Sequence, residues 1–232
     1  MLRVDGVHAA RGGAEVLHGV DLRVHRGEVV ALIGSNGAGK TTLLRTVCGL
    51  STPTRGSIEV AGASVVGVPA FLLARRGIAY VPAERRLFPG LSVADNLALG
   101  AYPHKPSRDR SDAVFALFPQ LTDRRSQAVG TMSGGEQRMV AIGRALMSDP
   151  ELLLLDEPTT GLAPGLAEEA YRVLGRLRDE GLTVLVAEQQ LHLALELADR
   201  AYVLADGRIA LEGSSASVRD DRAVRGAYLG LP

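Results

Sequence analysis

Residues 34–42, Gly-Ser-Asn-Gly-Ala-Gly-Lys-Thr-Thr, decide the fold of this chain. They match the pattern G-x-x-x-x-G-K-[ST], with Lys40 and Thr41 at its last two fixed positions. A hydrophobic strand is expected before them over residues 29–33, and a helix after them over residues 42–50. Strand, loop and helix in that order favour a phosphate-binding loop over an ordinary glycine turn, which is the alternative interpretation.

Each part of this loop has a role in holding phosphate. Glycines let the backbone curl so that successive N–H groups converge on phosphate oxygens, and the helix N-terminus adds partial positive charge. Lys40 is expected to reach the β- and γ-phosphates, and the Thr41 hydroxyl to bind Mg²⁺. The residues expected to bind nucleotide here are Gly34, Ser35, Asn36, Gly37, Ala38, Gly39, Lys40, Thr41 and Thr42.

The composition limits the class of protein. The chain has 232 residues, enough for one large domain or a domain with an inserted lobe, and its 26 basic residues balance 26 acidic ones. That balance gives no bias toward nucleic acid, which is not expected as a partner. The apolar runs fall short of the roughly 20 residues that span a bilayer, and no signal peptide is apparent. We therefore expect a cytoplasmic protein in which the lone cysteine, Cys48, packs beside the loop without an internal disulfide.

The pattern along the chain predicts an α/β fold with three parts. Residues 1–82 predict an N-terminal antiparallel β layer, with a hairpin turn at Gly12-Gly13, joined to nucleotide-binding strands. Residues 83–147 read as a helical lobe, in which Ser92 opens a short helix with a capping box. Apolar runs typical of central parallel strands resume in residues 148–232. The first and third parts are therefore expected to form one ATP-binding core, interrupted by the helical signature lobe.

A pair of carboxylates follows the apolar run at residues 152–155. Asp156 and Glu157 would lie at the carboxyl end of a buried strand, where α/β sheets place their sites. Asp156 is expected to hold the Mg²⁺ that bridges the phosphates. Glu157 is expected to accept a proton from the attacking water, or to orient it. The alternative is a simple turn at the end of the strand.

A second phosphate-binding surface is expected at residues 132–137, Met-Ser-Gly-Gly-Glu-Gln, just before a helix. A serine hydroxyl and glycine N–H groups would meet there at a helix N-terminus. Because one nucleotide has little use for two such surfaces in one chain, a head-to-tail dimer is the economical arrangement. Taken alone, Ser-Gly-Gly is an ordinary helix cap. The residues assigned to this surface are Ser133, Gly134, Gly135 and Glu136.

These motifs, GSNGAGKT, MSGGEQ and LLLLDEP in that order, resemble those of the ATP-binding cassette ATPases of ABC transporters. The segments VPAERRLFP, MSGGEQRMVAIGRALM, GLAP, AEQQ and VRGAYLG resemble the shorter ATPase subunit of branched-chain amino-acid importers. The resemblance implies a P-loop NTPase core that uses ATP and Mg²⁺. It also implies a homodimer, or a heterodimer with a sibling ATPase, docked under two permease subunits. Such an ATPase would be peripheral on the inner face of the plasma membrane and served indirectly by a substrate-binding protein.

Three positions depart from the general family pattern. Arg11 stands where an aromatic side chain usually stacks on adenine; a guanidinium can lie on a purine, or simply face solvent. Ala83 replaces a glutamine, with Glu84 as a candidate substitute for it. Gln189 replaces the usual histidine, and its amide can donate a hydrogen bond to the γ-phosphate but cannot become cationic. The resemblance gives, as the catalytic set, Lys40, Glu157 and Gln189.

Several functions are compatible with these residues. The leading hypothesis is an ATPase that energises branched-chain (hydrophobic) amino-acid import. The alternatives are a urea or amide importer, a lipid-type exporter, and a non-transport cassette ATPase. The last class usually carries two fused cassettes or a long coiled-coil insert, and this sequence has neither. The arginine pairs at 85–86 and 124–125 are interpreted as solvated surface.

Overall fold

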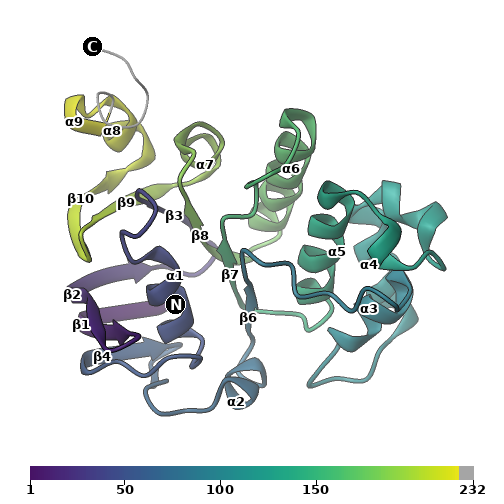
Figure 1. Cartoon of the computed structure of the whole chain (residues 1–232), viewed down its shortest axis with the longest axis horizontal. Helices are drawn as coiled ribbons and strands as arrows, with labels where there is room; N and C mark the ends of the chain where they lie inside the picture. The colour runs from purple at the N-terminus through teal and green to yellow at the C-terminus, as the bar shows by residue number, and fades with distance from the viewer. Residues whose placement is uncertain (225–232) are drawn as a thin grey trace.

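Two sheets and a group of helices make up the chain. The computed structural model describes residues 1–224, so the ending VRGAYLG lies, after its first residue, outside the described residues. Figure 1 shows β1, β2 and β4 on the left and the helices α3, α4 and α5 on the right, with β6 and β7 between them. The predicted α/β fold with an antiparallel layer and a helical lobe is confirmed.

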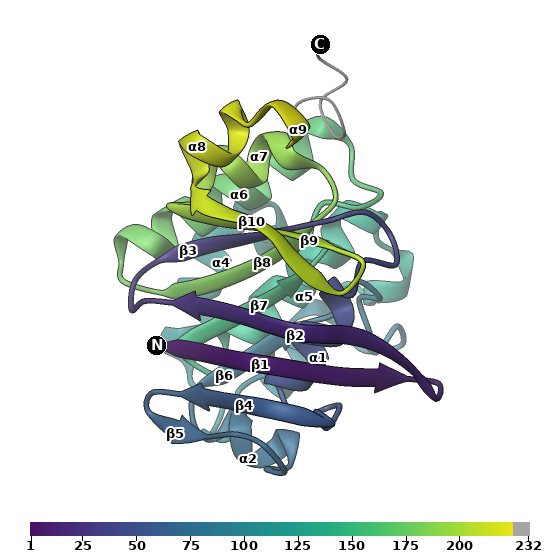
Figure 2. The ribbon, with the colours of Figure 1, turned by 90° about the vertical axis from the view of Figure 1, so that its left-hand side faces the viewer.

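The first sheet is the predicted antiparallel layer, with the strand order β2-β1-β4-β5. Its two long strands meet at Gly12-Gly13, where both φ angles are positive (62° and 86°), so the turn favours glycine. Figure 2 shows the strands side by side. Their bounds are β1 Leu2–Arg11, β2 Ala14–Val24, β4 Arg55–Val60 and β5 Ala63–Ser64.

The second sheet is six-stranded, with the order β10-β9-β3-β8-β7-β6, and carries the phosphate-binding loop. Its strands run parallel except β10, which turns back from β9 through Asp206-Gly207. Both turn residues have positive φ (45° and 71°), as a two-residue hairpin requires. The bounds are β3 Val29–Ile33, β6 Ile78–Val81, β7 Leu152–Asp156, β8 Thr183–Glu188, β9 Arg200–Ala205 and β10 Arg208–Ser214.

The helices connect these strands. Ser92 caps α3, because its hydroxyl accepts a hydrogen bond from the Asp95 N–H at 3.1 Å, but the Asp95 carboxylate accepts from the Ser92 hydroxyl at 2.6 Å in place of the backbone N–H that the predicted capping box requires. Within residues 1–224, no helix combines the length and apolar character that a membrane crossing demands. The bounds are α1 Lys40–Val47, α2 Ala70–Ala74, α3 Val93–Leu99, α4 Arg108–Leu117, α5 Gly134–Leu146, α6 Pro164–Asp179, α7 Leu191–Leu197, α8 Ser215–Asp220 and α9 Arg222–Val224, with 3-10 turns at Pro119–Arg124 and Val129–Thr131.

The parallel strands are buried on both faces. In β3, Val30 and Leu32 join an apolar cluster shared with the antiparallel sheet and α1. Ala31 and Ile33 point the other way, into a cluster with the helices α5, α6 and α7. A strand buried on both faces reads as a continuous apolar run, which is why residues 29–33 show no alternation. This double packing fixes the end of β3, where the phosphate-binding loop begins.

The packing of Cys48 against α1 leads to a test. Its side chain is 5% exposed, and burial raises the pKa of the thiol to about 12. Since the thiolate is the reactive form, about one folded molecule in ten thousand would carry it at pH 8. We expect a thiol reagent to label the native protein over hours and the urea-unfolded protein within minutes. Rapid stoichiometric labelling of native protein, followed by absorbance, would contradict the buried position.

Candidate nucleotide site

Residues 34–39 form a tight loop between β3 and α1. Gly37 and Gly39 have φ angles of 85° and 110°, in the left-handed region that glycine adopts without strain. A Cβ atom on Gly34 would lie 2.5 Å from the carbonyl oxygen of Leu204, which leaves room only for hydrogen. The sequence therefore folds here into the expected strand, glycine loop and helix, with Lys40 as the first residue of α1.

The Lys40 side chain is folded back over this loop. Its ammonium donates hydrogen bonds to the carbonyl oxygens of Gly34 at 2.7 Å and Ser35 at 3.1 Å. It also lies 3.3 Å from a carboxylate oxygen of Glu157, and the Lys40 side chain is only 4% exposed. One buried cation therefore joins the loop to the acidic pair at the end of β7.

Asp156, the last residue of β7, accepts two hydrogen bonds from hydroxyl groups. Thr41 Oγ1 donates to Oδ1 at 3.2 Å, and the Tyr80 hydroxyl donates to Oδ2 at 3.0 Å. Burial raises the pKa of this carboxyl, and the two hydrogen bonds oppose that shift. Among the ion pairs of residues 1–224, none includes Asp156. The arrangement is a buried carboxylate held beside the loop by neutral donors.

Tyr80 belongs to this site although it lies in no sequence motif. It lies on β6, next to β7 in the sheet, and its side chain is partly buried. Burial raises the pKa of its hydroxyl, as does the neighbouring Asp156, so Tyr80 stays protonated and donates its hydrogen bond. The available signal was its place near the end of a parallel strand beside the one that carries Asp156.

Glu157 has an unusual backbone conformation. Its φ is 45°, in the left-handed region, which costs a non-glycine residue about 1–3 kcal/mol and is typical of functional sites. Its N–H donates to the Ala187 carbonyl at 2.8 Å, and its side chain accepts a hydrogen bond from the Thr160 hydroxyl at 3.2 Å. With 18% of its side chain exposed, Glu157 can reach both Lys40 and solvent.

A cavity of about 260 Å³ opens over the loop. Arg11, from the end of β1, lies in its wall together with Glu157, and its contact with the base stays a prediction. Gln189 is exposed beyond β8, next to the Glu188 carbonyl that accepts the Gly34 N–H at 3.3 Å. The cavity is lined by Arg11, Val16, Ser35, Asn36, Gly37, Gly39, Lys40, Thr41, Thr42 and Glu157.

The segment around residue 83 lies elsewhere. Glu84, the candidate substitute for the missing glutamine, is 74% exposed, and its carboxylate lies 3.6 Å from the Arg86 guanidinium. Neither Glu84 nor Ala83 lines the cavity over the phosphate-binding loop; both line a different pocket. The structure therefore does not bring Glu84 to the phosphate-binding loop.

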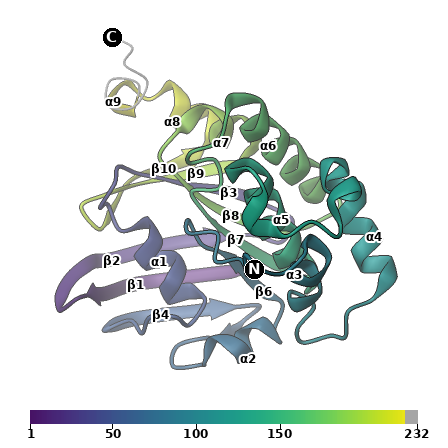
Figure 3. The same cartoon turned by 45° about the vertical axis from the view of Figure 1, so that its right-hand side comes forward.

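The Ser133 segment caps α5 at a separate place. The Ser133 N–H donates to a Glu136 carboxylate oxygen at 2.8 Å, and the Glu136 N–H donates to the Ser133 hydroxyl at 3.3 Å. Arg124 holds the same carboxylate at 3.2 Å. Ser133 is exposed, and Figures 1 and 3 show α5 and α1 on different sides of β6. Within one chain, this cap and the phosphate-binding loop are therefore separate surfaces.

The interpretation of the arginine pairs as solvated surface is wrong in part. Arg86 is exposed, but Arg85 is half-buried against the start of α5 and donates to the Gln137 side chain at 3.4 Å. Arg125 lies over the Phe115 ring, 3.9 Å from its centroid. Arg85 therefore departs from the solvated-surface interpretation, whereas Arg125 stays exposed, with 45% of its side chain accessible, although its guanidinium lies on an aromatic ring.

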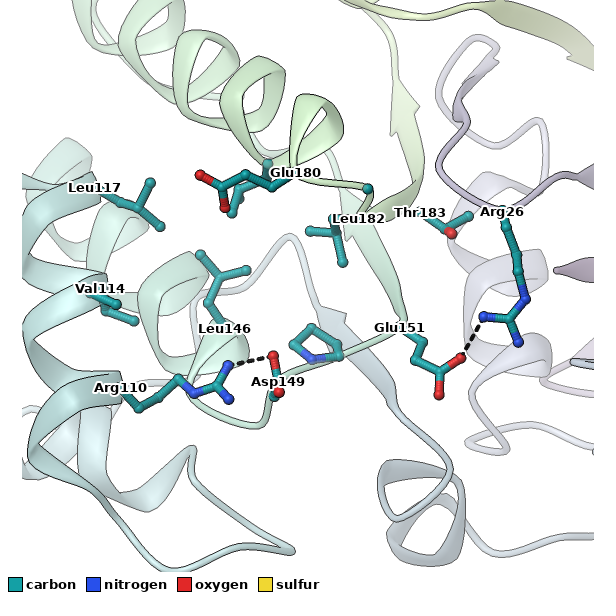
Figure 4. Close-up of a pocket in the computed structure, with 14 residues that line it drawn as sticks. Arg26, Arg110, Val114, Leu117, Leu146, Asp149, Glu151, Glu180, Leu182 and Thr183 are labelled. Carbon is teal, nitrogen blue, oxygen red and sulfur yellow. Dashed lines mark hydrogen bonds and ion pairs between the residues drawn. The ribbon is translucent and has the colours of Figure 1, made fainter.

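Another cavity, of about 410 Å³, lies at the opposite ends of the strands. Figure 4 shows its two ion pairs, Arg26–Glu151 and Arg110–Asp149, around a floor of leucines. Arg26, Glu151 and Thr183 come at the amino ends of β3, β7 and β8, whereas the phosphate-binding loop follows a carboxyl end. This cavity is therefore distinct from the nucleotide site.

Comparison with known proteins agrees with this geometry. The family model described as "ABC transporter" matches residues 17–160. The chain is 48% identical over 232 residues to the high-affinity branched-chain amino acid transport ATP-binding protein BraG of Pseudomonas aeruginosa, covering 99% of this chain and 100% of that one. It is 36% identical over 222 residues to the lipopolysaccharide export system ATP-binding protein LptB of Escherichia coli, covering 94% and 92%.

A solved structure gives the same fold. The dimeric, post-hydrolysis ATP-binding cassette MJ0796, bound to ADP and Pi, superposes with a TM-score of 0.83 at 26% identity, covering 93% of this chain and 99% of that one. The chain therefore belongs to the ABC transporter family. Within that family it is an ATP-binding subunit that hydrolyses ATP.

The Lys40 contacts predict a binding defect. Replacing Lys40 with alanine removes the charged donor, and hydrogen bonds to charged groups contribute about 1.5–3 kcal/mol each. We expect Lys40→Ala to weaken ATP binding roughly 10- to 100-fold in an equilibrium titration. The other lysine of the chain, Lys105, lies in an exposed loop, so Lys105→Ala is the matched control. Undiminished ATP affinity in Lys40→Ala would contradict the assigned role.

Proposed function

We propose that this chain hydrolyses ATP to energise the import of branched-chain (hydrophobic) amino acids. The observation that carries the chemistry is the contact between Lys40 on the phosphate-binding loop and Glu157 after β7, at 3.3 Å. The similarity to BraG over nearly the whole of both chains supports the transport assignment. A loop that holds a triphosphate and an acid beside it are the two parts that hydrolysis needs.

The residues beside the loop fit Mg²⁺. Magnesium prefers oxygen ligands, and the Thr41 hydroxyl and the Asp156 carboxylate, 3.2 Å apart, supply them. Asp156 is 1% exposed and forms no ion pair within residues 1–224, so a cation would satisfy its buried charge. When bound, Mg²⁺ would neutralise charge on the phosphates. We assign Thr41 and Asp156 to it on these grounds.

Glu157 is assigned as the base, and Lys40 controls its access to water. Lys40 interacts with the Glu157 carboxylate and with the loop carbonyls. A triphosphate in the loop competes for the ammonium and frees the carboxylate to accept a proton from water. Gln189, exposed past the end of β8, is assigned to donate its amide N–H to the γ-phosphate.

The exposed Ser133 cap completes a site on a second chain. ABC ATPase cassettes work as dimers with membrane permease subunits. Ser133 Oγ accepts a hydrogen bond from the Glu136 N–H, and no acceptor within residues 1–224 takes its own proton. That proton and the N-terminal charge of the 13-residue α5 are directed at the phosphates of a partner's ATP. We assign Ser133, Gly134, Gly135 and Glu136 to this contact.

The division of the chain follows from these roles. Residues 1–82 and 148–232 would bind and hydrolyse ATP, and residues 83–147 would carry the signature contact to the partner. The dimer partner is a second copy or a sibling ATPase, and two permease subunits would hold the pair at the inner face of the membrane. A substrate-binding protein would deliver the amino acid to those permeases. A lipid-type exporter is the second candidate, because LptB is 36% identical.

A conservative substitution tests the assignment of Glu157. Glu157→Gln keeps the shape and the hydrogen bond from Thr160 but cannot take a proton. We expect turnover, measured as phosphate release, to fall roughly 10²–10⁴-fold, about 3–5 kcal/mol of barrier, while ATP stays bound. Glu151, at the other end of the same strand segment, is exposed, so Glu151→Gln is the control. Unchanged turnover in Glu157→Gln would remove this residue from the mechanism.

The transport assignment needs the assembled system. The chain would be co-purified with its two permease subunits and reconstituted in vesicles with their substrate-binding protein. We expect leucine, isoleucine or valine with that binding protein to stimulate ATP hydrolysis several-fold, and Glu157→Gln to abolish the stimulation. Stimulation by urea or by a lipid instead, with none by these amino acids, would overturn the assigned substrate while leaving the ATPase intact.

A further inference from the structure

Arg138 occupies a place that the nucleotide site does not explain. It lies on the second turn of α5, five residues after Ser133, and is 1% exposed. Figure 3 shows α5 packed beside the ends of the strands β6 and β7. Unlike the exposed arginines of this segment, the Arg138 guanidinium points inward from α5 and reaches the backbone of two other segments.

Three backbone carbonyl groups accept hydrogen bonds from this guanidinium. Nη1 donates to the carbonyl oxygen of Pro82 at 2.8 Å, and Nη2 donates to that of Ala83 at 2.8 Å. Nη2 also lies 3.3 Å from the carbonyl oxygen of Glu157. A single side chain therefore joins α5, the segment after β6, and the residue assigned as the base.

The charge of Arg138 is costly in this position. No carboxylate within residues 1–224 forms an ion pair with it, and its Nε is buried without a hydrogen-bond partner. Burial lowers the pKa of the guanidinium and the nearby Arg85 lowers it further, while the carboxylates of Glu188, Asp156 and Glu157 oppose that shift without outweighing it. Filling this space with an apolar side chain would avoid the desolvation of a cation. Filling space in the core therefore does not explain why an arginine lies at this position.

The contact with Glu157 acts on a strained residue. Glu157 keeps its left-handed φ of 45° while its N–H is held by the Ala187 carbonyl at 2.8 Å. Arg138 holds the carbonyl on the other side of the same residue. Without that second hydrogen bond, Glu157 is free to relax toward an ordinary conformation, and its carboxylate would leave its position 3.3 Å from Lys40.

We propose that Arg138 is a positioning residue that holds the Glu157 carboxylate in its catalytic place and ties that place to α5. Arg138 contacts residue 83 through the backbone carbonyl, so this contact does not need the glutamine side chain that Ala83 lacks. Since Ser133 begins the same helix, a partner's nucleotide that engages the cap would act on Glu157 through Arg138. This inference rests on the proposed role of Glu157 as the base.

A double-mutant cycle tests the assignment. Arg138→Gln, Glu157→Gln and the double variant are compared with the unchanged chain by single-turnover ATP hydrolysis. We expect Arg138→Gln to lower kcat 10- to 100-fold, because a small displacement of a catalytic group costs about that much, with KM for ATP changed less than threefold. In the Glu157→Gln background, the Arg138 substitution should change the rate less than twofold.

Two further variants separate positioning from stability. Arg138→Lys keeps the charge but lacks the planar guanidinium, so we expect it to recover only part of the activity. It also replaces Arg138→Gln in the experiment if that variant does not fold. Arg144 lies on the same helix, half-buried, and donates to the Arg85 carbonyl at 3.5 Å, so Arg144→Lys is the control, expected within threefold of the unchanged kcat.

The outcomes distinguish the two hypotheses. Equal, additive losses from Arg138→Gln in both backgrounds, or a rise in KM with unchanged kcat, would overturn the positioning role. Recovery of full activity in Arg138→Lys alongside a restored melting temperature would also overturn it, since a structural role accounts for that pattern. Unchanged turnover in Glu157→Gln alone would instead refute the proposed base, on which this inference depends.

Discussion

The parallel pairing of β3 with β8, and of β8 with β7, is the constraint on which the site depends. Ile33 pairs with Glu188 and Asp156 with Ala187, so β3 and β7 end at the same edge of the sheet. This register brings the Thr41 hydroxyl to the Asp156 carboxylate although 115 residues separate them in sequence. A slip of one residue in β7 would turn Asp156 to the other face of the sheet and remove it from the loop. The pairing of the strands therefore determines which side chains lie beside the phosphate-binding loop.

The same edge of the sheet holds buried charged groups, and their burial costs free energy. Lys40, Asp156 and Glu188 are nearly fully buried, and burial raises the pKa of both carboxyl groups. Glu188 is compensated by the N–H and hydroxyl of Thr159, at 3.1 and 2.6 Å. From the part of the chain that the structure describes, Asp156 accepts hydrogen bonds only from hydroxyl groups. The apolar clusters on both faces of the sheet supply the stability that lets such a polar edge persist.

Much of this could be predicted from the sequence, because local rules decide it. The apolar run at residues 29–33, the glycine loop and the run before Asp156 each specify their own conformation and their edge of the sheet. Local patterns do not predict the contacts of side chains that bridge segments far apart in the sequence. Tyr80 lies in no motif, and Arg138 lies in the run MSGGEQRMVAIGRALM, whose pattern does not indicate its inward contacts. The roles of both depend on which segments the fold places side by side. Arg85 looked like a surface charge because nothing in its neighbourhood indicates that α5 begins against it.

The proposed partner contact at Ser133 and the Arg138 contact with Glu157 both belong to α5. Ser133, at the start of α5, is exposed, while Arg138 on the next turn faces inward to Glu157. Five residues of α-helix span about 7.5 Å, and a hydrogen-bonded helix moves as a rigid body over that length. Under the proposed roles, a displacement of the cap by bound phosphate would reach the guanidinium, and through it the backbone of Glu157, which has a left-handed φ. Hydrolysis would then wait for the partner, because the base is in place only when α5 is.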